Sequence, residues 1–413
     1  MVEIASMKVI YIHQYFRTPD QGGAVRSYHL AKGMVEAGIE VEMITTHALS
    51  DYDQRWIDGI RVHYLPVDYD QKFGFFKRIW AFWRFVTKAK KLVKKLPRPD
   101  LLYITSTPLT TGLIGLWAKK RMAIPYVFEV RDLWPEAPIQ VGAIRNPVTK
   151  SLLYSLERKI YDQALSLVAL SPGIAAHLQK ISPQREVALI PNFSDLNRFY
   201  PKEKNQKLAV ELGISAGLTL VYTGALGQVN AVEELLELAE IAQKKGKNWG
   251  FLIMGTGSFE QRLRDLTKAK NLKNVWFIPF GSKEKVNEVL SLADLAWISF
   301  AHLPVLKTNS PNKFFDALAA GKAIIVNHKG WVYDLVKTYE LGISCLPGKM
   351  DAAIAKLEKL EENPSELGRL SKNSRILAET YFSKEIAVSR LLELINPQPK
   401  TTTQGGAVDI RTA

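Results

Sequence analysis

The chain has 413 residues, which exceeds the length of one typical hydrophobic core and predicts two domains. Its composition, 47% hydrophobic and 23% charged, is typical of a soluble globular protein. The single cysteine, Cys345, excludes a disulfide framework and most thiolate metal sites. The first residues lack the basic region and cleavage site of a signal peptide, so we expect a cytoplasmic protein.

The first half of the chain alternates short apolar runs with helical segments. A helix is expected at about 24–37, and further helices separate the later runs. The expected strands are 8–16, 41–47, 60–65, 101–105, 125–130, 165–171 and 187–192. Such alternation predicts a parallel sheet with right-handed crossovers.

The segment between Asp70 and Asp100 is basic and aromatic, and it contains no acidic residue. A helix dense in aromatic residues and flanked by cations is typical of a segment lying in a bilayer interface beside anionic lipid. The residues expected to meet the membrane are Phe76, Lys77, Arg78, Trp80, Trp83 and Arg84. Two other interpretations stay open. The aromatic residues could belong to the core with solvated lysines around them, or the segment could bind nucleic acid, for which no recognition motif is present.

A second alternating set follows the linker at 191–201, PNFSDLNRFYP. Its expected strands are 218–224, 250–255, 275–280 and 294–300, and its expected helices are 231–245, 259–269 and 286–292. This pattern predicts a second Rossmann-like domain. Residues from 397 to 413 are rich in Thr, Gly and Pro, and we expect them to be disordered.

The stretch 305–326, VLKTNSPNKFFDALAAGKAIIV, is the most informative part of the sequence. A polar loop precedes a helix that opens near Lys313, and the carboxylate of Asp316 follows within an apolar turn. Free main-chain N–H groups and the positive end of a helix favour a phosphate, and a carboxylate one turn later can accept hydrogen bonds from a ribose. The segment therefore predicts a nucleotide site.

This stretch resembles the donor-binding signature of family 4 retaining glycosyltransferases, whose usual form is E-x7-E followed by a small-residue, Gly, Lys or Arg turn. Asp316 stands where the second Glu usually is, and Thr308 stands where the first would be. The run Ser310-Pro311-Asn312-Lys313 is similar to that of members that resemble L-fucosamine transferases of surface-polysaccharide biosynthesis. The linker resembles the family's interdomain turn, with Phe193 in its Gly position.

The resemblance implies the GT-B fold, an α/β architecture of two facing Rossmann-like domains with a cleft between them. The expected domains are an acceptor-side domain at 1–191 and a nucleotide-sugar domain at 192–379, with a final helix at about 380–396 packing back onto the first. The cleft at the carboxyl ends of the strands is then the expected active site.

The resemblance also assigns site residues. Asp132 and Asp316 are the expected catalytic residues, and Arg131 and Glu136 are expected to bind the acceptor. The expected donor-binding residues are Gly22, Gly23, Gly224, Gly227, Gly255, Gly257, Arg262, Phe280, Ser310, Pro311, Asn312 and Lys313. No spacing of His and carboxylates predicts a metal site, and no cofactor is expected beyond the nucleotide sugar as substrate.

The function that the resemblance implies is a metal-independent, retaining transfer of a sugar from a nucleotide sugar. UDP is favoured as the nucleotide, and the acceptor would be lipid-linked or a polysaccharide at the cytoplasmic face of the membrane. Two alternatives stay open: a nucleotide-sugar epimerase of the same fold, and a non-catalytic scaffold associated with the membrane.

Overall fold

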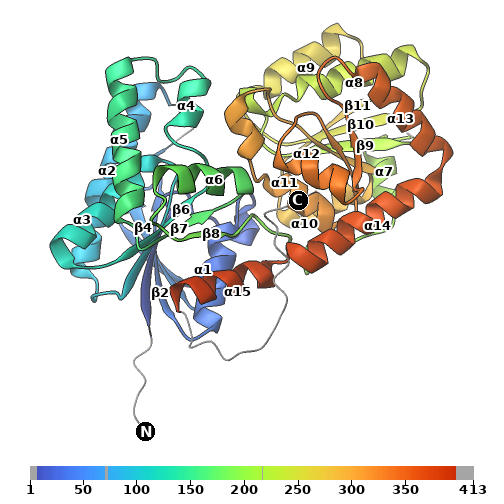
Figure 1. The fold of residues 1–413 in the computed structure, drawn as a ribbon. Helices are drawn as coiled ribbons and strands as arrows, with labels where there is room; N and C mark the ends of the chain where they lie inside the picture. The colour runs from blue at the N-terminus through green and yellow to red at the C-terminus, as the bar shows by residue number, and fades with distance from the viewer. Residues whose placement is uncertain (1–6, 70–72, 216, 397–413) are drawn as a thin grey trace. The chain divides into compact units, whose positions relative to one another are not determined.

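The computed structural model describes residues 7–69, 73–215 and 217–396, and its contacts divide the chain into two units (Figure 1). Within the described residues, the first unit contains 7–18, 24–191 and 385–396, and the second contains 19–23 and 192–384. The tail at 397–413, for which we expect disorder, lies outside the described residues.

The first unit is built on an eight-stranded sheet with the order β3-β4-β2-β1-β5-β6-β7-β8. All neighbouring strands are parallel except β3 and β4, which are antiparallel. Parallel strands covered on both faces need continuous apolar runs, and β1, β5 and β6 are buried at every residue. The strands are β1 (Lys8–Ile12), β2 (Glu40–His47), β3 (Asp53–Ile57), β4 (Ile60–Pro66), β5 (Leu101–Thr105), β6 (Tyr126–Val130), β7 (Ser166–Ala169) and β8 (Val187–Leu189).

Helices connect these strands, and the last helix of the chain joins them. They are α1 (Arg26–Glu36), α2 (Phe75–Lys95), α3 (Gly112–Met122), α4 (Glu136–Gln140), α5 (Pro147–Gln163), α6 (Pro172–Ile181) and α15 (Lys384–Ile395), with a 3-10 turn η2 (Leu109–Thr111). The far end of the chain thus returns to its beginning: α15 lies beside α1 in Figure 1, and a Cβ at Gly33 of α1 would collide with the side chain of Val388.

Helix α2 divides its aromatic residues between two faces. Ala81, Phe85, Ala89 and Val93 recur every four residues and are buried, which is the pattern of one packed helix face. On the other side Phe76, Ile79, Trp80 and Trp83 have exposed fractions of 84, 47, 61 and 51%. The aromatic residues therefore do not all belong to the core. No helix in the described part of the chain combines the length and the apolar character needed to cross a bilayer.

The second unit is built on a six-stranded, all-parallel sheet with the order β11-β10-β9-β12-β13-β14. Its strands are β9 (Thr219–Thr223), β10 (Gly250–Met254), β11 (Val275–Ile278), β12 (Leu295–Ile298), β13 (Ala323–Val326) and β14 (Gly342–Ser344). Successive residues of a strand point to opposite faces, so Leu220 and Tyr222 of β9 belong to one apolar core and Val221 to the other.

Helices of the second unit cover both cores. They are α7 (Gln206–Glu211), α8 (Glu233–Lys244), α9 (Glu260–Ala269), α10 (Lys283–Ser291), α11 (Asn312–Ala319), α12 (Trp331–Thr338), α13 (Met350–Glu362) and α14 (Pro364–Tyr381). Shorter 3-10 turns are η1 (Pro19–Gln21), η3 (Gln228–Asn230) and η4 (Pro304–Thr308).

Two Rossmann-like α/β units are thus present, and the predicted fold class is confirmed. Strand β3 was not predicted. Its residues, DQRWI, are polar and largely exposed because β3 is the antiparallel edge strand of its sheet, so they lack the apolar run by which the other strands were recognised.

Candidate active site

The carboxyl edge of the second sheet has a switch point between β9 and β12. The strands β10 and β11 lie on one side of β9, whereas β12, β13 and β14 continue on the other side. Loops that leave neighbouring strands in opposite directions make room for a ligand at such a point. Tyr222 and Gly224 at the end of β9, with Ser299 and Phe300 after β12, are placed there by the topology.

Lys313, the second residue of α11, brings its ammonium group to this point. Its Nζ lies 3.0 Å from Tyr222 Oη and 3.4 Å from both Asn230 Oδ1 and the main-chain oxygen of Ser299. The same Nζ lies 4.2 and 4.8 Å from the ring centroids of Tyr222 and Phe300. Neutral oxygen atoms and ring faces therefore surround the cation.

The Lys313 site lacks a counter-charge of its own. Within the described residues, Lys313 forms no ion pair with Asp or Glu, and burial lowers the pKa of its ammonium group to about 7. An anionic ligand would restore the balance, because a nearby negative charge favours the protonated form. The site is thus suited to a phosphate.

Three glycines bring the neighbouring loops close to this site. A Cβ at Gly255 would collide with the main-chain oxygen of Gly224, and a Cβ at Gly257 would collide with the main chain of Leu226. The loops after β9 and β10 therefore pack main chain against main chain, which only glycine permits at these two positions. A Cβ at Gly224 would lie 3.7 Å from Cε of Lys313, so this loop passes directly beside the lysine side chain.

The turn before α11 is held by the linker that follows the first unit. The main-chain N–H of Asn192 donates to Ser310 Oγ at 3.1 Å, and its Nδ2 donates to the main-chain oxygen of Ser310. Ser194 Oγ donates to the main-chain oxygen of Phe315 at 2.7 Å. Pro311 is the residue before the helix and Asn312 is its first residue, so the predicted turn and helix start lie where the sequence placed them.

Asp316 is engaged in a buried ion pair. Lys283 Nζ of α10 donates to Asp316 Oδ2 at 2.6 Å, and the two residues are 7 and 9% exposed. Burial raises the pKa of the Asp316 carboxyl above its usual value, and the adjacent Lys283 opposes this rise. No local pattern in the sequence marks this pairing, which joins two helices.

A second polar network supports the loop after β12. Asn327 Oδ1 accepts from the main-chain N–H of Phe300 at 2.9 Å, and its Nδ2 donates to Glu234 Oε2 at 3.0 Å. His302 also contacts Glu234, with 2.7 Å between Nε2 and Oε1. The neighbouring His328 is buried, which lowers its pKa to about 4 and keeps its imidazole neutral at physiological pH. These residues were missed because only the fold brings them together.

Other expected donor residues lie outside the Lys313 cluster. The Arg262 side chain is 63% exposed and has its Nε 3.5 Å from Glu233 Oε1. Phe280 is 46% exposed after β11, and Gly227 adopts an ordinary extended conformation before η3. Gly22 and Gly23 both adopt positive φ, at 67° and 82°.

In the first unit, the expected residues follow β6. Arg131 Nη1 donates to His13 Nε2 at 3.1 Å, and Asp132 beside it is exposed. Glu136 accepts hydrogen bonds from Tyr154 Oη at 2.5 Å and Gln140 Nε2 at 2.6 Å. The bond from Tyr154 is the main cause that lowers the pKa of the Glu136 carboxyl.

A fully buried ion pair lies nearby. Arg26 Nε donates to Glu129 Oε2 at 3.0 Å, and Tyr103 Oη donates to the same oxygen at 2.7 Å. Arg26 Nη1 and Nη2 donate to the main-chain oxygens of Pro191 and Ile190 at 2.5 and 2.8 Å. Arg26 and Glu129 therefore hold the end of the first unit and have structural roles.

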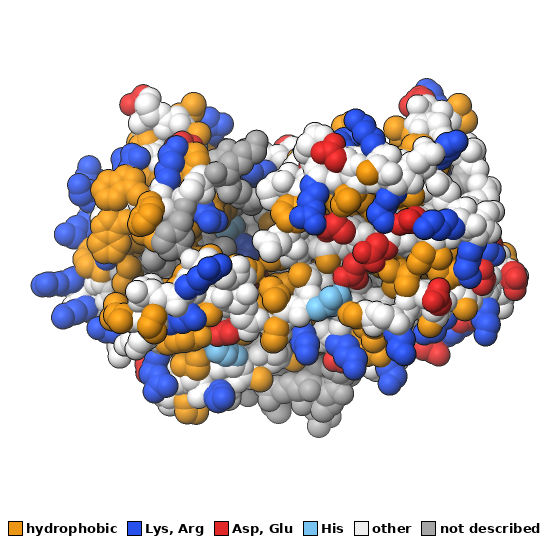
Figure 2. All heavy atoms as spheres, turned by 90° about the horizontal axis from the view of Figure 1, so that it is seen from above, with side chains coloured by type: hydrophobic (Ala, Val, Ile, Leu, Met, Phe, Trp, Pro, Cys, Tyr) orange, Lys and Arg blue, Asp and Glu red, His pale blue; other side chains and the backbone are white. Residues whose placement is uncertain are grey.

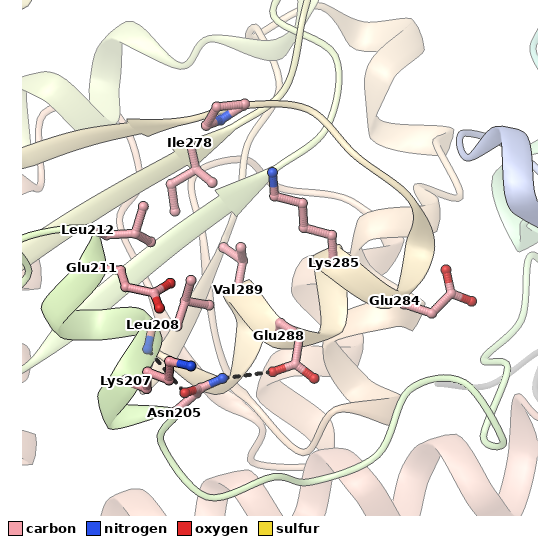
Figure 3. A pocket seen from close by; sticks show the side chains of 11 residues that line it. Asn205, Lys207, Leu208, Glu211, Leu212, Ile278, Glu284, Lys285, Glu288 and Val289 are labelled. Carbon is pink, nitrogen blue, oxygen red and sulfur yellow. Dashed lines mark hydrogen bonds between the residues drawn. The ribbon is translucent and has the colours of Figure 1, made fainter.

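A cavity of about 580 Å³ lies between α7 and α10 of the second unit (Figure 3). Leu208, Leu212, Ile278 and Val289 form its apolar wall, and charged side chains, among them Lys285 in Figure 3, surround them. The expected site residues do not line this cavity. No group of His, Cys, Asp and Glu residues suited to a metal ion is found in the described ranges.

Comparison with known families matches both halves of the chain. Residues 21–192 match the Glycosyl transferase 4-like domain, and residues 204–376 match Glycosyl transferases group 1. An uncharacterised glycosyltransferase of Haemophilus influenzae is 28% identical over 199 residues, which are 48% of this chain and 52% of that protein. The chain thus matches about half the length of this relative.

A longer match covers nearly the whole chain. An alpha-monoglucosyldiacylglycerol synthase of Acholeplasma laidlawii is 24% identical over 385 residues, 87% of this chain and 90% of that protein.

Solved structures share the fold. Sucrose-phosphate synthase from Thermosynechococcus elongatus superposes with a TM-score of 0.77 at 19% identity, covering 94% of this chain and 98% of that chain. Anabaena HepE in complex with UDP-glucose superposes with a TM-score of 0.70 at 15% identity, covering 94% of this chain and 99% of that chain. Both domain matches and this shared architecture identify the chain as a glycosyltransferase of the family 4 type with the GT-B fold.

Proposed function

We propose that the chain transfers a sugar, with retention of anomeric configuration and without a metal ion, from a UDP-sugar to a lipid-linked or polysaccharide acceptor. The proposal places this reaction at the inner face of the cell membrane. The observation that carries it is the Lys313 site, where a half-buried ammonium group lies at the switch point of a parallel sheet without a carboxylate partner among the described residues.

The Lys313 ammonium group and the start of α11 would balance the charge of the leaving diphosphate. In the transfer, the bond between the anomeric carbon and the diphosphate oxygen breaks, and a bond to the acceptor oxygen forms on the same face of the sugar. The proton of the acceptor hydroxyl passes to the departing diphosphate. Negative charge develops on the diphosphate, so a cation held ready for it stabilises the transition state. Support for the nucleotide comes from Anabaena HepE, whose structure holds UDP-glucose.

Asp132 and Asp316 have separate parts in the proposal. Asp132 is exposed after β6, where its carboxylate can reach a sugar or acceptor hydroxyl. Asp316 would act while Lys283 is hydrogen-bonded to its Oδ2. Its other carboxylate oxygen would accept a hydrogen bond from a hydroxyl of the donor, or Asp316 would hold Lys283 in place to contact the donor. The run 310–313 resembles that of L-fucosamine transferases, so UDP-linked L-fucosamine is one donor to test.

Calorimetric titration tests the donor site. UDP, GDP and their sugars, including UDP-linked L-fucosamine, are titrated into the intact chain and into the Lys313→Ala variant. We expect UDP to bind, and loss of one charge-assisted contact, worth about 1.5–3 kcal/mol, to weaken it about 10- to 100-fold. The matched control is Lys307→Ala, because Lys307 is exposed just before the same turn. If the wild-type chain binds no nucleotide, or if both variants bind like wild type, the proposed donor site is wrong.

Two further measurements test the chemistry. NMR of the product sugar reports whether its anomeric configuration matches that of the donor. Turnover in the presence of a chelator reports whether the reaction needs a divalent ion. Inversion, or loss of turnover that added Mg²⁺ restores, would contradict the proposal.

The exposed face of α2 is the proposed membrane contact. Figure 2 shows hydrophobic side chains gathered over the first unit, at the left of the view, with Lys and Arg side chains around them. On α2, Trp80 and Trp83 are exposed between the cations Lys77, Arg78 and Arg84. Exposed tryptophans beside cations suit the interface of an anionic bilayer. The name of the Acholeplasma relative, alpha-monoglucosyldiacylglycerol synthase, supports a lipid surface as the place of reaction.

Flotation with anionic vesicles tests this contact. We expect the wild-type chain to float with vesicles of phosphatidylglycerol and phosphatidylcholine. The double variant with Trp80→Ser and Trp83→Ser should remain at the bottom of the density gradient. Trp56→Ser is the control, since Trp56 is 68% exposed on β3 and lies outside α2. Equal flotation of all three proteins would contradict the assignment of α2.

A further inference from the structure

Three neighbouring strands of the first sheet end at the same place. The strand order places β5 between β1 and β6, with Tyr103 of β5 in register with Tyr11 of β1 and Val127 of β6. The residues that follow these strands are His13, Ser106 and Arg131. The switch point of this sheet lies between β1 and β5, because β2 lies on the other side of β1.

Arg131 is fixed at this edge by neutral partners. Its main-chain N–H donates to Ser106 Oγ at 2.9 Å, and its Nη1 donates to His13 Nε2 at 3.1 Å. His13 is 3% exposed, and its Nδ1 lies 2.8 Å from Ser27 Oγ. Since Nε2 accepts from Arg131, the proton of the imidazole is on Nδ1 and is donated to Ser27.

The charge of Arg131 is not neutralised by these contacts. Burial and the guanidinium itself hold the pKa of His13 well below its usual value, so the imidazole contributes no charge of either sign. In the part of the chain that the structure describes, Arg131 forms no ion pair with a carboxylate, and its nearest carboxyl in sequence is that of the adjacent Asp132. Desolvation raises the pKa of the Asp132 carboxyl, and the charge of Arg131 opposes this rise. Arg26 differs, because Glu129 lies 2.9 Å from its Nη2.

A second group at the same strand end is also unsatisfied. Gln14 directly follows His13 and is 1% exposed, yet neither Oε1 nor Nε2 of its amide has a hydrogen-bond partner among the described residues. A buried amide of this kind costs about 1–3 kcal/mol unless water or a ligand completes it. The edge thus combines a half-buried cation with polar atoms that lack partners.

We propose that Arg131 binds a phosphate-type oxyanion of a substrate and that His13 is the positioning residue that holds its guanidinium. This inference rests on the proposed transferase function and extends it to the first unit. A guanidinium suits a phosphate because its planar donors match two oxygens at once. With Nη1 given to His13, the remaining donors of the guanidinium are available for the oxyanion.

Two substrates could supply the oxyanion: the diphosphate of the donor, or the phosphate of a lipid-linked acceptor. Both present the same chemistry to Arg131, so the experiment uses separate probes. UDP and inorganic pyrophosphate stand for the donor, and a short-chain polyprenyl phosphate in detergent stands for the acceptor. Each is titrated calorimetrically into the intact chain.

The variants are Arg131→Ala, Arg131→Lys, His13→Ala and His13→Gln, with Arg121→Ala as a matched control at the exposed end of α3. We expect Arg131→Ala to weaken one probe about 10- to 100-fold, the loss expected for a charge-assisted hydrogen bond. Arg131→Lys should recover part of the loss, because it keeps the charge and loses the paired donors. Arg121→Ala should bind like wild type.

Substitutions at His13 show whether it positions the guanidinium of Arg131 or only stabilises the fold. His13→Ala should weaken the same probe less than Arg131→Ala, and His13→Gln should restore binding, because its Oε1 can accept from Arg131. In a double-mutant cycle the effects of His13→Ala and Arg131→Ala should be less than additive if both act through one contact. Circular-dichroism melting of every variant confirms that losses are measured on folded protein.

The outcomes distinguish this inference from the proposed function. Loss confined to UDP and pyrophosphate assigns Arg131 to the donor, and loss confined to polyprenyl phosphate assigns it to the acceptor. If wild type binds UDP, Lys313→Ala weakens it, and Arg131→Ala changes no probe by more than twofold, the inference is wrong and the donor site stands. If wild type binds no nucleotide, the proposed function fails, and the polyprenyl phosphate titration alone decides the role of Arg131.

Discussion

In each unit, a cation paired with a buried carboxylate can be compared with a cation that has no such partner among the described residues. Arg26 and Lys283 lie 2.9 and 2.6 Å from Glu129 and Asp316. Arg131 and Lys313, in contrast, contact neutral nitrogen, oxygen or ring atoms and form no ion pair with a carboxylate in the described ranges. A cation near the carboxyl end of a parallel sheet is therefore, by itself, a poor guide to a ligand site. We separate the structural cations from the cations proposed to bind a ligand by whether the fold already supplies the opposite charge.

The largest effect should come from breaking the buried pair of Arg26 and Glu129. Glu129→Ala leaves the guanidinium of Arg26 buried and uncompensated, and we expect it to lower the free energy of unfolding by about 3–5 kcal/mol. Urea denaturation measures this. Arg131→Ala should cost far less in the same assay, and equal losses for the two variants would remove the distinction between paired and unpaired cations.

Asp316→Ala should affect both stability and turnover. It leaves Lys283 without its partner, so we expect a loss of stability toward the lower end of the same range, about 3 kcal/mol, because this pair is slightly exposed. Turnover of the nucleotide sugar should be abolished in variant protein that denaturation curves show to be folded. Asp316→Asn keeps the shape without the charge, and full activity in that variant would contradict a role for the carboxylate.

Lys313 should make nucleotide binding depend on pH. In the folded chain burial lowers its pKa from 10.5 to about 7, so between these values the unfolded chain carries more protons. The contribution of Lys313 to stability therefore rises as pH increases from 7 to 10.5. Bound UDP favours the charged ammonium group, so above pH 7 binding should take up a proton.

The affinity for UDP should accordingly fall as pH rises above 7, by up to about tenfold per pH unit. Calorimetry in two buffers with different ionisation enthalpies counts the protons taken up. Lys313→Met should bind UDP weakly at every pH and take up none. An affinity in wild type that stays constant from pH 6.5 to 9 would contradict the assigned environment.

The smallest effect is expected at Arg262. Its side chain is exposed and meets Glu233 at 3.5 Å, and a surface pair of this kind contributes about 0–1 kcal/mol to stability. We expect Arg262→Ala to change UDP affinity less than threefold in the titration used for Lys313→Ala. A loss as large as that of Lys313→Ala would make Arg262 a second cation of the donor site.

Local patterns in the sequence predicted the fold well and the site in part. Apolar runs such as 101–105 marked the parallel strands, and the Pro-broken turn before Lys313 marked the start of α11, because both depend on neighbouring residues only. The pairing of Arg26 with Glu129 joins residues 103 positions apart, and the contact of Arg131 with His13 spans 118 positions. Such pairs follow from the order of strands in the sheet, which no local pattern encodes. The membrane contact, the acceptor and the L-fucosamine relationship stay predictions.

The three acceptors gathered by Arg26 have a consequence for sequence variation. One planar fork serves the Glu129 carboxylate and the carbonyls of Ile190 and Pro191 together. Lysine carries the same charge but has a single nitrogen, so it cannot reach all three. In a library with every residue tried at each position of α1, survivors should vary freely at the exposed Glu36 and retain arginine alone at 26.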